Sequence, residues 1–534
     1  MSHRRPLASL CAGLAVLATA ATAATGSDVA ATAFCPAPPP MTFTEPTYVD
    51  TTRAGGEPIV FTMPNGRILY GSHAGTTHFY SPDAADPNTI AFMEQYRGQT
   101  HYWWSDTQGG EWDFAEREAA GAAAASGFSD PEFAVDIAGN VYVSEINLVN
   151  VAVSKSTNGG ESYVLQNPTA NVFTDRQWME ADTEGVVYMV SNPTGPGGSV
   201  NPGEADTYQV NSGHTMYKST DGGVTWTDGF PDPGGLGDIR VDKNDGTVYE
   251  AHLEGSELTI HAWRNARNED FTTKVDAEVN IVYDDVHMLA HWPAFDLDPS
   301  GNLYMVWDDN GVGELEAGIY YSYSKTKGKT WSAPQRVNTN ANTAIWPWIG
   351  VGDDGRVGIA WFEADTELPG HDAETDGTHG WRVVGATSIT ALGCEGGKLP
   401  SFAVGTMTPE PIHTGTICQG GTTCQAFLID RRLGDYFSVE VDGKGMMYAA
   451  YSDTREGGSV SLPGFVRQKT GASLLAPKAP VTPPKKPTVP TKPNKPETKP
   501  DDEIATTGLD VALPVSAVVF AVAAVALRRR RREA

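Results

Sequence analysis

The chain has 534 residues and a formal net charge of −28, from 38 Lys and Arg against 66 Asp and Glu. DNA and RNA are bound through clustered basic residues, so this charge excludes a nucleic-acid partner. With 57 Gly, 36 Pro and 13 Trp, the composition favours many short strands joined by turns over a helical fold.

The two ends of the chain are basic and the body between them is strongly acidic. Setting aside the thirteen basic and six acidic residues of the ends leaves a body of net charge near −35. Residues 1–25 have the order of a secretory signal peptide, with Arg4 and Arg5 before the apolar run Leu7–Leu17 and small residues after it. We therefore expect the body to be secreted.

One sequence pattern recurs along the body with small variations: an apolar residue, any residue, an Asp, a Gly three residues later, any residue, and then Val or Leu before Tyr. Its copies are Phe133–Val143, Met179–Met189, Ile239–Glu250, Phe295–Trp307, Ile349–Trp361 and Val439–Tyr451, with a looser first copy at Val60–Gly71. Each copy reads as a strand, a tight polar turn and a second strand rich in β-branched and aromatic residues. The repeats predict seven β-hairpins.

A second motif follows several of these hairpins. Ser219, Asp221, Gly223, Thr225 and Trp226 fill every fixed position of Ser-x-Asp-x-Gly-x-Thr-Trp, and degenerate copies begin at Ser105, Ser156 and Ser324. In such a turn the Ser and Asp side chains satisfy turn amides, Gly takes the left-handed conformation, and Trp packs between strands. We interpret these residues as structural and not catalytic.

These repeats resemble the Asp-box repeats of the sialidase-like β-propellers, over roughly residues 57–470. The resemblance implies an all-β fold in which four-stranded blades stack radially around a central channel. The body, residues 34–476, is then one domain and not the three that its length alone suggests. Seven hairpins predict seven blades, or six if the first copy is not a blade.

A propeller binds its ligand at the mouth of the channel, so polar residues that precede the first strand of each hairpin are the candidate ligand-binding residues. They are Asp130, Asp175, Arg176, Asp238, His291, Trp346, Arg432 and Asp435. Carboxylates, Arg side chains and Trp faces together are typical of carbohydrate sites. The alternative is that these residues form salt bridges and capping hydrogen bonds between blades.

The sialidase resemblance implies three Arg around a substrate carboxylate, a Tyr–Glu nucleophile pair, an Asp that acts as general acid/base, and an Arg-Ile-Pro motif. Arg-Ile-Pro does not occur, and Arg67-Ile68-Leu69 is the nearest string. Tyr436 or Tyr451 would be the phenol, beside Glu440 or Asp453, but no alignment fixes them. The resemblance therefore carries the fold over, and the catalytic residues remain unassigned.

Two functions follow as hypotheses. In the first, the protein is displayed at the cell surface and binds an extracellular glycan or other polymer at the channel mouth. In the second, it is an exo-glycosidase of the exo-α-sialidase type at the same face. The acidic body would repel an acidic glycan, which favours binding of an uncharged or cationic ligand.

We assign no metal site from the sequence. The acid pairs Asp284-Asp285, Asp308-Asp309 and Asp353-Asp354 offer hard oxygen ligands that suit Ca²⁺. None has the spacing of a dedicated calcium loop, so we interpret them as turn residues, with Ca²⁺ as the alternative.

Four cysteines remain after the signal peptide, and in an oxidising compartment they form disulfides. Of the three pairings, we predict Cys418–Cys424 as a local clip and Cys35–Cys394 as a tie from the N-terminus to a late repeat.

The C-terminal end predicts an anchor. Residues 477–503 are rich in Pro and Lys and form an extended stalk. Residues 504–534 contain Ile-Ala-Thr-Thr-Gly, the apolar run 509–527 and five Arg, an order that resembles a Gram-positive sortase sorting signal. The resemblance implies that a sortase cuts between Thr507 and Gly508 and joins the body to the cell wall; the alternative is a membrane anchor.

Overall fold

The computed structural model describes residues 33–73, 80, 100–117, 129–147, 150–172, 174–193, 214–232, 237–271, 276–288, 292–420, 424 and 429–477. Its contacts divide the chain into residues 1–477 and 478–534, and all described residues belong to the first unit. The predicted signal peptide, the stalk beyond Pro477 and the sorting signal lie outside the described residues. Within the described part, no helix is long and apolar enough to span a bilayer.

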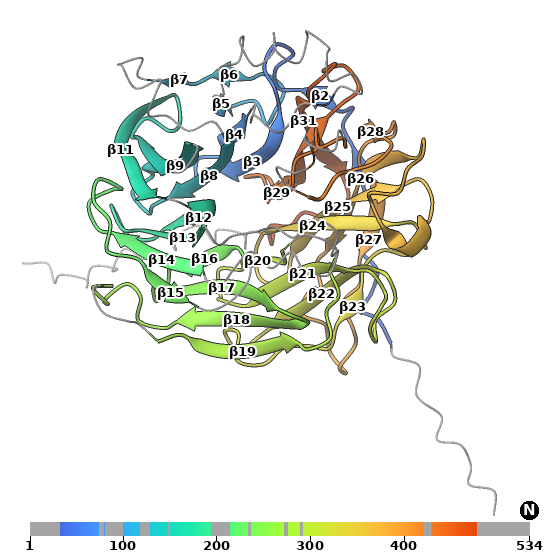
Figure 1. Cartoon of the computed structure of the whole chain (residues 1–534). Coiled ribbons are helices and arrows are strands. Elements are labelled where there is room, and N and C mark those ends of the chain that lie inside the picture. The colour runs from blue at the N-terminus through green and yellow to red at the C-terminus, as the bar shows by residue number, and fades with distance from the viewer. Residues whose placement is uncertain are drawn as a thin grey trace, which may run out of the picture. The chain divides into compact units, whose positions relative to one another are not determined.

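The described residues form seven sheets placed radially around a common centre (Figure 1). Blade 1 contains β3 (Gly56–Thr62), β4 (Ile68–His73), β5 (Thr100–Ser105) and β6 (Asp113–Phe114). Blade 2 contains β8 (Ser129–Val135), β9 (Val141–Asn147), β10 (Asn150–Ser156) and β11 (Ser162–Val172), with β7 (Glu116–Arg117) beside β11. Blade 3 contains β12 (Thr174–Ala181), β13 (Val187–Pro193), β14 (His214–Ser219) and β15 (Phe230–Asp232).

The remaining blades repeat the same strand order from the channel to the rim. Blade 4 contains β16 (Ile239–Asp242), β17 (Thr247–Glu254), β18 (Glu257–Trp263) and β19 (Glu278–Tyr283). Blade 5 contains β20 (Ala294–Leu297), β21 (Leu303–Asp309), β22 (Gly318–Ser324) and β23 (Gln335–Arg336). Blade 6 contains β24 (Ala344–Val351), β25 (Val357–Ala364), the 3₁₀ turn η2 (Pro369–His371), β26 (Gly380–Ser388), β27 (Ala403–Thr406) and β28 (His413–Thr414). The fold is therefore the predicted all-β propeller, and it has seven blades, the first formed by the looser repeat.

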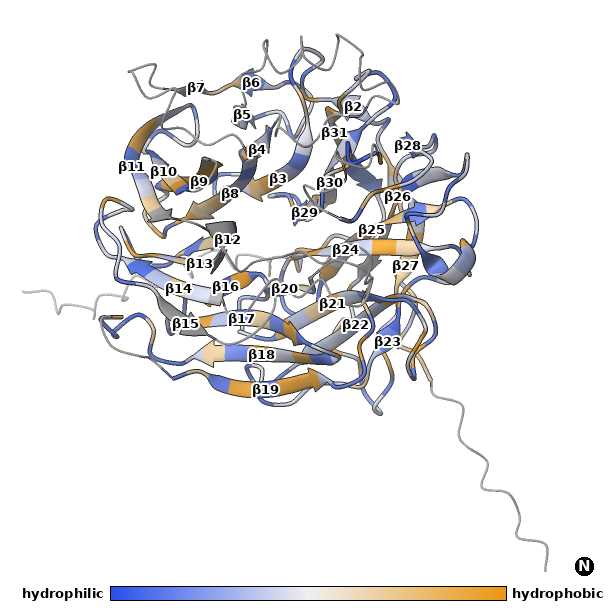
Figure 2. Ribbon diagram, in the orientation of Figure 1, coloured by the Kyte–Doolittle hydropathy of each residue, from blue (hydrophilic) through white to orange (hydrophobic). Residues whose placement is uncertain are grey.

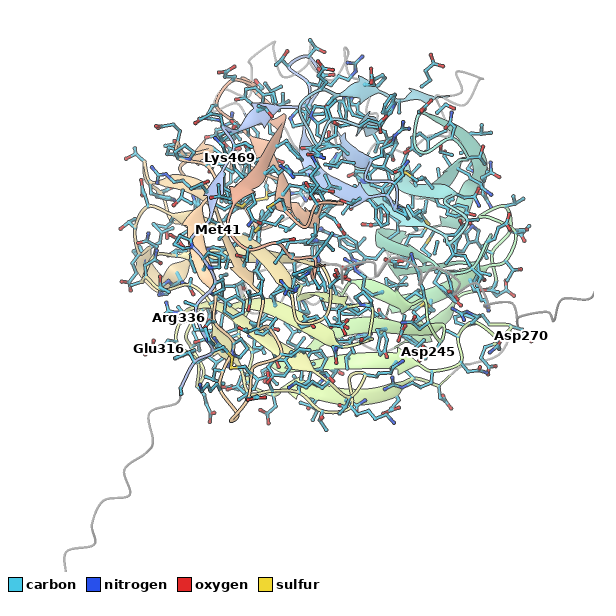
Figure 3. All side chains as sticks on the ribbon, turned by 180° about the vertical axis from the view of Figure 1, so that it is seen from behind. Met41, Asp245, Asp270, Glu316, Arg336 and Lys469 are labelled. Carbon is cyan, nitrogen blue, oxygen red and sulfur yellow. A yellow bond between two sulfur atoms is a disulfide. The ribbon has the colours of Figure 1, made fainter. Side chains whose placement is uncertain are left out.

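Blade 7 joins the two ends of the ring. Its inner strands are β29 (Ser438–Val441), β30 (Met447–Asp453) and β31 (Leu462–Thr470), and its outer strands β1 (Thr42–Phe43) and β2 (Thr47–Tyr48) come from the N-terminus. Thr42 lies opposite Thr470, and Figure 3 shows the neighbouring residues Met41 and Lys469 at this seam. Closure in this way leaves only short sheet edges exposed to solvent.

The Asp of the hairpin repeat holds its own turn and also the next blade. Asp298 Oδ1 accepts hydrogen bonds from the backbone N–H groups of Ser300 and Asn302, both at 3.0 Å. Its Oδ2 accepts one from Gly355 N of blade 6 at 3.3 Å. Gly301 completes the turn at φ 79°, a conformation that favours glycine. This double role explains why the same turn recurs around the ring.

The second motif forms the turn between the third and fourth strands of blades 1, 2, 3 and 5. In blade 3, Ser219 Oγ accepts a hydrogen bond from Gly223 N at 2.9 Å, and Asp221 Oδ1 accepts one from Thr225 N at 2.9 Å. The serines that begin the other three copies accept the equivalent bond at 2.9–3.0 Å, from Gly109 to Ser105, Gly160 to Ser156 and Gly328 to Ser324. The four turns therefore share one hydrogen-bond pattern.

The core lies between neighbouring blades. One large cluster of buried apolar side chains runs from Met41 to Leu474, and smaller clusters fill the contacts of blades 4 with 5, 2 with 3, and 7 with 1. Apolar segments appear on inner and outer strands alike, for example β24 and β19 (Figure 2). Both predicted disulfide pairings are present, Cys35–Cys394 and Cys418–Cys424.

Candidate functional site

Four inner strands begin with the same irregularity. In β3, β8, β12 and β24 the ladder to the second strand skips two residues. The first skipped residue has a left-handed backbone in each case: Glu57 (φ 44°), Asp130 (50°), Arg176 (55°) and Trp346 (56°). This conformation is costly for residues other than glycine, and such bulges redirect side chains, often beside binding sites. We call the end of the channel where these strands begin the mouth.

The mouth contains a buried polar network that joins blade 1 to blade 7. Glu57 Oε2 lies 2.8 Å from His73 Nε2, and Glu57 Oε1 accepts a hydrogen bond from Asp435 N at 3.0 Å. Arg431 Nη2 pairs with Asp435 Oδ2 at 2.5 Å and lies 3.6 Å from Glu57 Oε1. All four side chains are at most 5 % exposed. Opposite charges thus compensate one another where water is largely excluded.

Asp130 and Arg176 extend this network to blades 2 and 3. Arg176 forms an ion pair with Asp435, and its guanidinium lies 4.8 Å from the ring centre of Trp292. Ligand atoms of Asp130, Glu57 and His73 lie within 4.8 Å of one another. Among the described residues this is the one group of three His, Cys, Asp or Glu side chains close enough to share a metal ion.

An aromatic cluster lies directly below the mouth. Trp178, Trp292, Trp348 and Tyr436 come from blades 3, 5, 6 and 7, and each is at most 3 % exposed. The ring centre of Trp178 lies 5.3 Å from that of Trp292, 5.8 Å from that of Trp348 and 5.4 Å from that of Tyr436. The four rings thus pack against one another across the centre of the propeller, below the polar network of the mouth.

The structure brings together some of the predicted site residues and separates others. Asp130, Arg176 and Asp435 lie in the mouth network, and Trp346 occupies the equivalent bulge of blade 6. Asp238 lies deeper, where its Oδ1 pairs with Arg240 Nη1 at 2.7 Å. Arg432 pairs with Asp430 at 2.6 Å, and its neighbour Arg431 is the one that reaches Asp435.

Two further predictions fall outside what the structure describes, namely His291 and the side chain of Asp175. Among the residues that the sialidase resemblance suggested, Tyr436 lies below the mouth, where its hydroxyl donates to Pro131 O at 3.4 Å. Arg67 lies elsewhere, paired with Asp106 at 2.8 Å and Glu161 at 2.9 Å.

Three residues of the mouth network were not predicted from the sequence, namely Glu57, His73 and Arg431. Glu57-Pro58 precedes the loose first repeat just as Asp130-Pro131 and Trp346-Pro347 precede theirs, so the repeat could have identified it. His73 ends the second strand of its hairpin, and no local pattern marks it. The sequence predicted Arg432, which is adjacent to Arg431. Which of the two side chains reaches Asp435 depends on the backbone conformation of the segment before β29.

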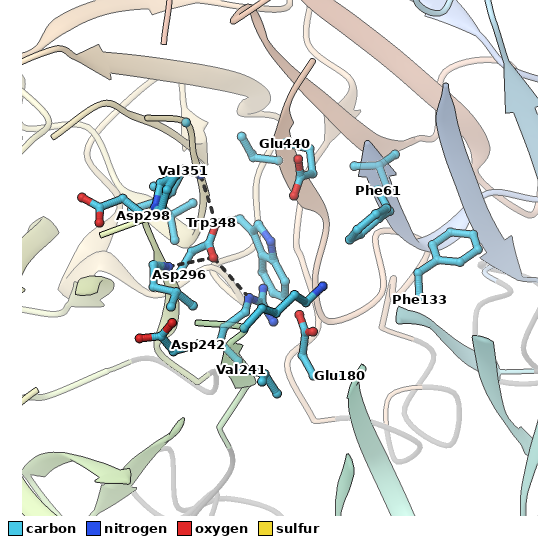
Figure 4. Close-up of a pocket in the computed structure, with 18 of the residues that line it drawn as sticks. Phe61, Phe133, Glu180, Val241, Asp242, Asp296, Asp298, Trp348, Val351 and Glu440 are labelled. Carbon is cyan, nitrogen blue, oxygen red and sulfur yellow. Dashed lines mark hydrogen bonds and ion pairs between the residues drawn. The ribbon is translucent and has the colours of Figure 1, made fainter. Parts of the chain in front are cut away.

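A cavity of about 380 Å³, which we call the chamber, occupies the opposite part of the channel. It is lined by the ends of the inner strands and by the turns that follow them, with Trp348 and Phe61 on its walls. Figure 4 shows Glu180, Asp296 and Glu440 pointing toward a common centre from three different blades. Glu132 and Arg240 complete the ring of charged groups.

Burial changes the acidity of this ring. It raises the pKa of Glu440 to about 8, with the Asp296 charge adding to the effect. It also raises the pKa of Asp296 and of Asp238 to about 6, against the opposing effect of Arg240. The pKa of Glu132 lies well above its usual value because of burial and the nearby Asp238. Burial therefore favours the protonated form of these carboxyl groups unless a nearby positive charge compensates the ionised form.

Two of the three acid pairs considered for Ca²⁺ accept hydrogen bonds from segments distant in the chain. Asp308 Oδ2 accepts a bond from Trp346 N at 2.9 Å, and Asp309 Oδ2 accepts one from His287 N at 3.0 Å. Asp353 accepts one from Ala476 N at 2.6 Å and Asp354 one from Ser300 Oγ at 2.5 Å. Turn and blade contacts therefore account for these carboxylates.

Comparison with known proteins finds similarity among solved structures. No protein-family model and no curated protein matches the chain. A protein of unknown function from Dyadobacter fermentans is 12 % identical, with 81 % of this chain and 99 % of that one covered and a TM-score of 0.39. NanB sialidase from Streptococcus pneumoniae is 12 % identical over 81 % of this chain and 71 % of its own, with a TM-score of 0.37. An α-L-arabinanase of Penicillium chrysogenum, complexed with arabinobiose, is 11 % identical over 80 % and 98 %, with a TM-score of 0.36.

Proposed function

We propose that this protein is an extracellular, surface-displayed propeller that binds a glycan or another extracellular polymer at the mouth of its channel. The observation that carries the proposal is the set of four bulges at Glu57, Asp130, Arg176 and Trp346, all at the same end of the inner strands. Backbone strain repeated at one end of a channel is expected where side chains are positioned for a ligand.

The chemistry of the mouth supports a sugar as the ligand. Carboxylates and guanidiniums offer acceptors and donors to hydroxyl groups, and the rings of Trp178 and Trp292 lie beneath them. The two disulfides fit an oxidising compartment outside the cytoplasm. The signal peptide and the sorting signal predicted from the sequence would place the body there on a stalk.

A glycan array tests the binding proposal with the purified protein. We expect selective signals for neutral or cationic glycans, and a loss of at least tenfold in affinity for the isosteric variants Asp130→Asn and Glu57→Gln. Glu254→Gln, on the exposed end of β17, is the matched control. An array without signal above background, or equal affinity for Asp130→Asn and the control, would refute the proposal.

The alternative function is exo-glycosidase activity of the exo-α-sialidase type at the same face. The mouth holds three buried carboxyl groups, those of Glu57, Asp130 and Asp435, and glycoside hydrolysis commonly uses a pair. A fluorogenic sialoside and neutral fluorogenic glycosides would reveal turnover. Turnover abolished by Asp130→Asn supports this alternative, whereas no turnover of any substrate leaves binding as the function.

A further inference from the structure

The chamber lacks positive charge for the acids that surround it. Glu132, Glu180, Asp296 and Glu440 line it from four blades, and Asp238 is ion-paired with the lining residue Arg240. The basic lining residues are Arg240 and Lys243. Arg240 is engaged by Asp238 at 2.7 Å, Ile239 O at 2.8 Å and Asp296 at 3.7 Å, and Lys243 Nζ donates to Val135 O at 2.8 Å. These two cations are thus committed to existing contacts.

Two carboxylate oxygens of this ring have no hydrogen-bond donor among the described residues. They are Glu132 Oε2 and Asp238 Oδ2, and the residues that carry them are 7 % and 1 % exposed. Glu132 lines the chamber itself. A buried carboxylate oxygen without a donor is costly, so a donor that enters the chamber gains a strong, charge-assisted hydrogen bond.

The geometry of the chamber favours an organic cation over a metal ion. In the described part of the chain, no three acids of the chamber bring their oxygens within 4.8 Å of one another, as a shared metal ion would require. The space of about 380 Å³ exceeds what a bare ion needs and falls in the range of small-molecule sites. Trp348 lines the wall, and an indole face attracts organic ammonium groups.

We propose that the chamber is a binding site for a small organic cation that carries a primary ammonium group. The ammonium would donate to Glu132 and to the neighbouring acids, while its carbon skeleton would pack against Trp348 and Phe61. The site lies at the end of the inner strands opposite to the mouth and does not rest on glycan binding there.

Calorimetry with a matched pair of probes tests this site. We expect n-pentylammonium chloride to bind the full-length protein at pH 7.5 at least tenfold more tightly than n-pentanol, which has the same chain without the charge. Because cation binding displaces protons from the ring, the affinity should rise between pH 6 and 8. Glu132→Gln and Trp348→Leu should each weaken pentylammonium binding at least fivefold, and Glu254→Gln should not.

Control measurements distinguish an ammonium site from an apolar cavity and from a metal-ion site. A melting curve of Glu132→Gln, which keeps the side-chain shape, establishes that the variant is folded. Equal affinity for pentanol would show a merely apolar cavity, and CaCl₂ that displaces the amine with higher affinity would show a metal-ion site. Either result, or no heat with pentylammonium, would overturn the proposal, and none of them bears on glycan binding at the mouth.

Discussion

At the scale of single residues, the channel separates two kinds of charged group. In the mouth, the carboxylates of Glu57 and Asp435 face the guanidiniums of Arg176 and Arg431, so opposite charges are matched. In the chamber, the acids outnumber the bases and their pKa values are raised by burial. The same side-chain type is thus ion-paired at one end of the channel and has a raised pKa at the other.

A pH dependence of stability follows from Glu440. Its pKa in the folded protein is raised from 4.5 to about 8, so the protonated carboxyl stabilises the fold below the unfolded value. That contribution is lost as the pH rises through about 8. We expect the melting temperature, measured in cation-free buffer, to fall between pH 5 and 8.5, and to fall several degrees less in Glu440→Gln.

Glu254→Gln is the control for this measurement, because Glu254 is exposed at the end of β17. Its melting profile should follow the wild type at every pH. A Glu440→Gln profile parallel to the wild type would contradict the assignment of this slope to the chamber.

At the scale of elements, the two repeated turns account for the regular spacing of the blades. The hairpin turn of one blade is hydrogen-bonded to the next blade. In blade 2, for example, Asp136 Oδ2 accepts a hydrogen bond from Gly185 N of blade 3 at 3.1 Å. The second motif closes each blade internally and places an aromatic residue against it, as Trp226 does where it packs on the core between blades 2 and 3. The residues that form each turn lie close together in the sequence, so the repeats can be recognised without the structure.

The serine of the second motif should contribute measurably to stability. Ser219 Oγ accepts from Gly223 N at 2.9 Å and donates to Asp221 Oδ1 at 2.9 Å. Ser219→Ala leaves the buried amide without its acceptor, and we expect a loss of about 1–2 kcal/mol in the free energy of unfolding. Urea denaturation measures it, with the exposed neighbour variant Thr220→Ala as control. Equal losses in the two variants would refute this role of the serine.

At the scale of the whole molecule, the ring is held at one seam. The outer strands of blade 7 come from the N-terminus, and Cys35–Cys394 ties residues 359 positions apart. The clip Cys418–Cys424 spans only 6 positions. A cross-link across most of the chain restricts the unfolded state far more than a local one.

The two disulfides should therefore differ in their effect. We expect the double variant Cys35→Ser with Cys394→Ser to lose about 3–5 kcal/mol in the free energy of unfolding, and Cys418→Ser with Cys424→Ser to lose roughly 2 kcal/mol less than that. Urea denaturation of the non-reduced proteins compares them. Identical losses would contradict the argument from loop length.

The propeller could be predicted from the amino-acid sequence because its turns are built from residues close together in the chain. The hairpin repeats predict the two inner strands of all seven blades, and the spacing of Ser219 to Trp226 predicts the turn between the third and fourth strands. Turn chemistry depends on side chains two to four residues from the amides they satisfy, so a pattern is enough to reveal it.

Which polar residues meet in the channel depends on how the ring closes. Arg431 joins Glu57 because blade 7 returns to blade 1, a contact between segments more than 350 residues apart, whereas His73 reaches Glu57 across the first hairpin of blade 1. The carboxyl groups of Glu180, Asp296 and Glu440 look like ordinary strand residues in the sequence, and they meet in the chamber because each lies on an inner strand two residues before the Asp of its hairpin turn. The interaction between two charged groups, and hence their pKa values, depends on their distance in space. Closure of the ring of blades sets these distances, and the local sequence does not.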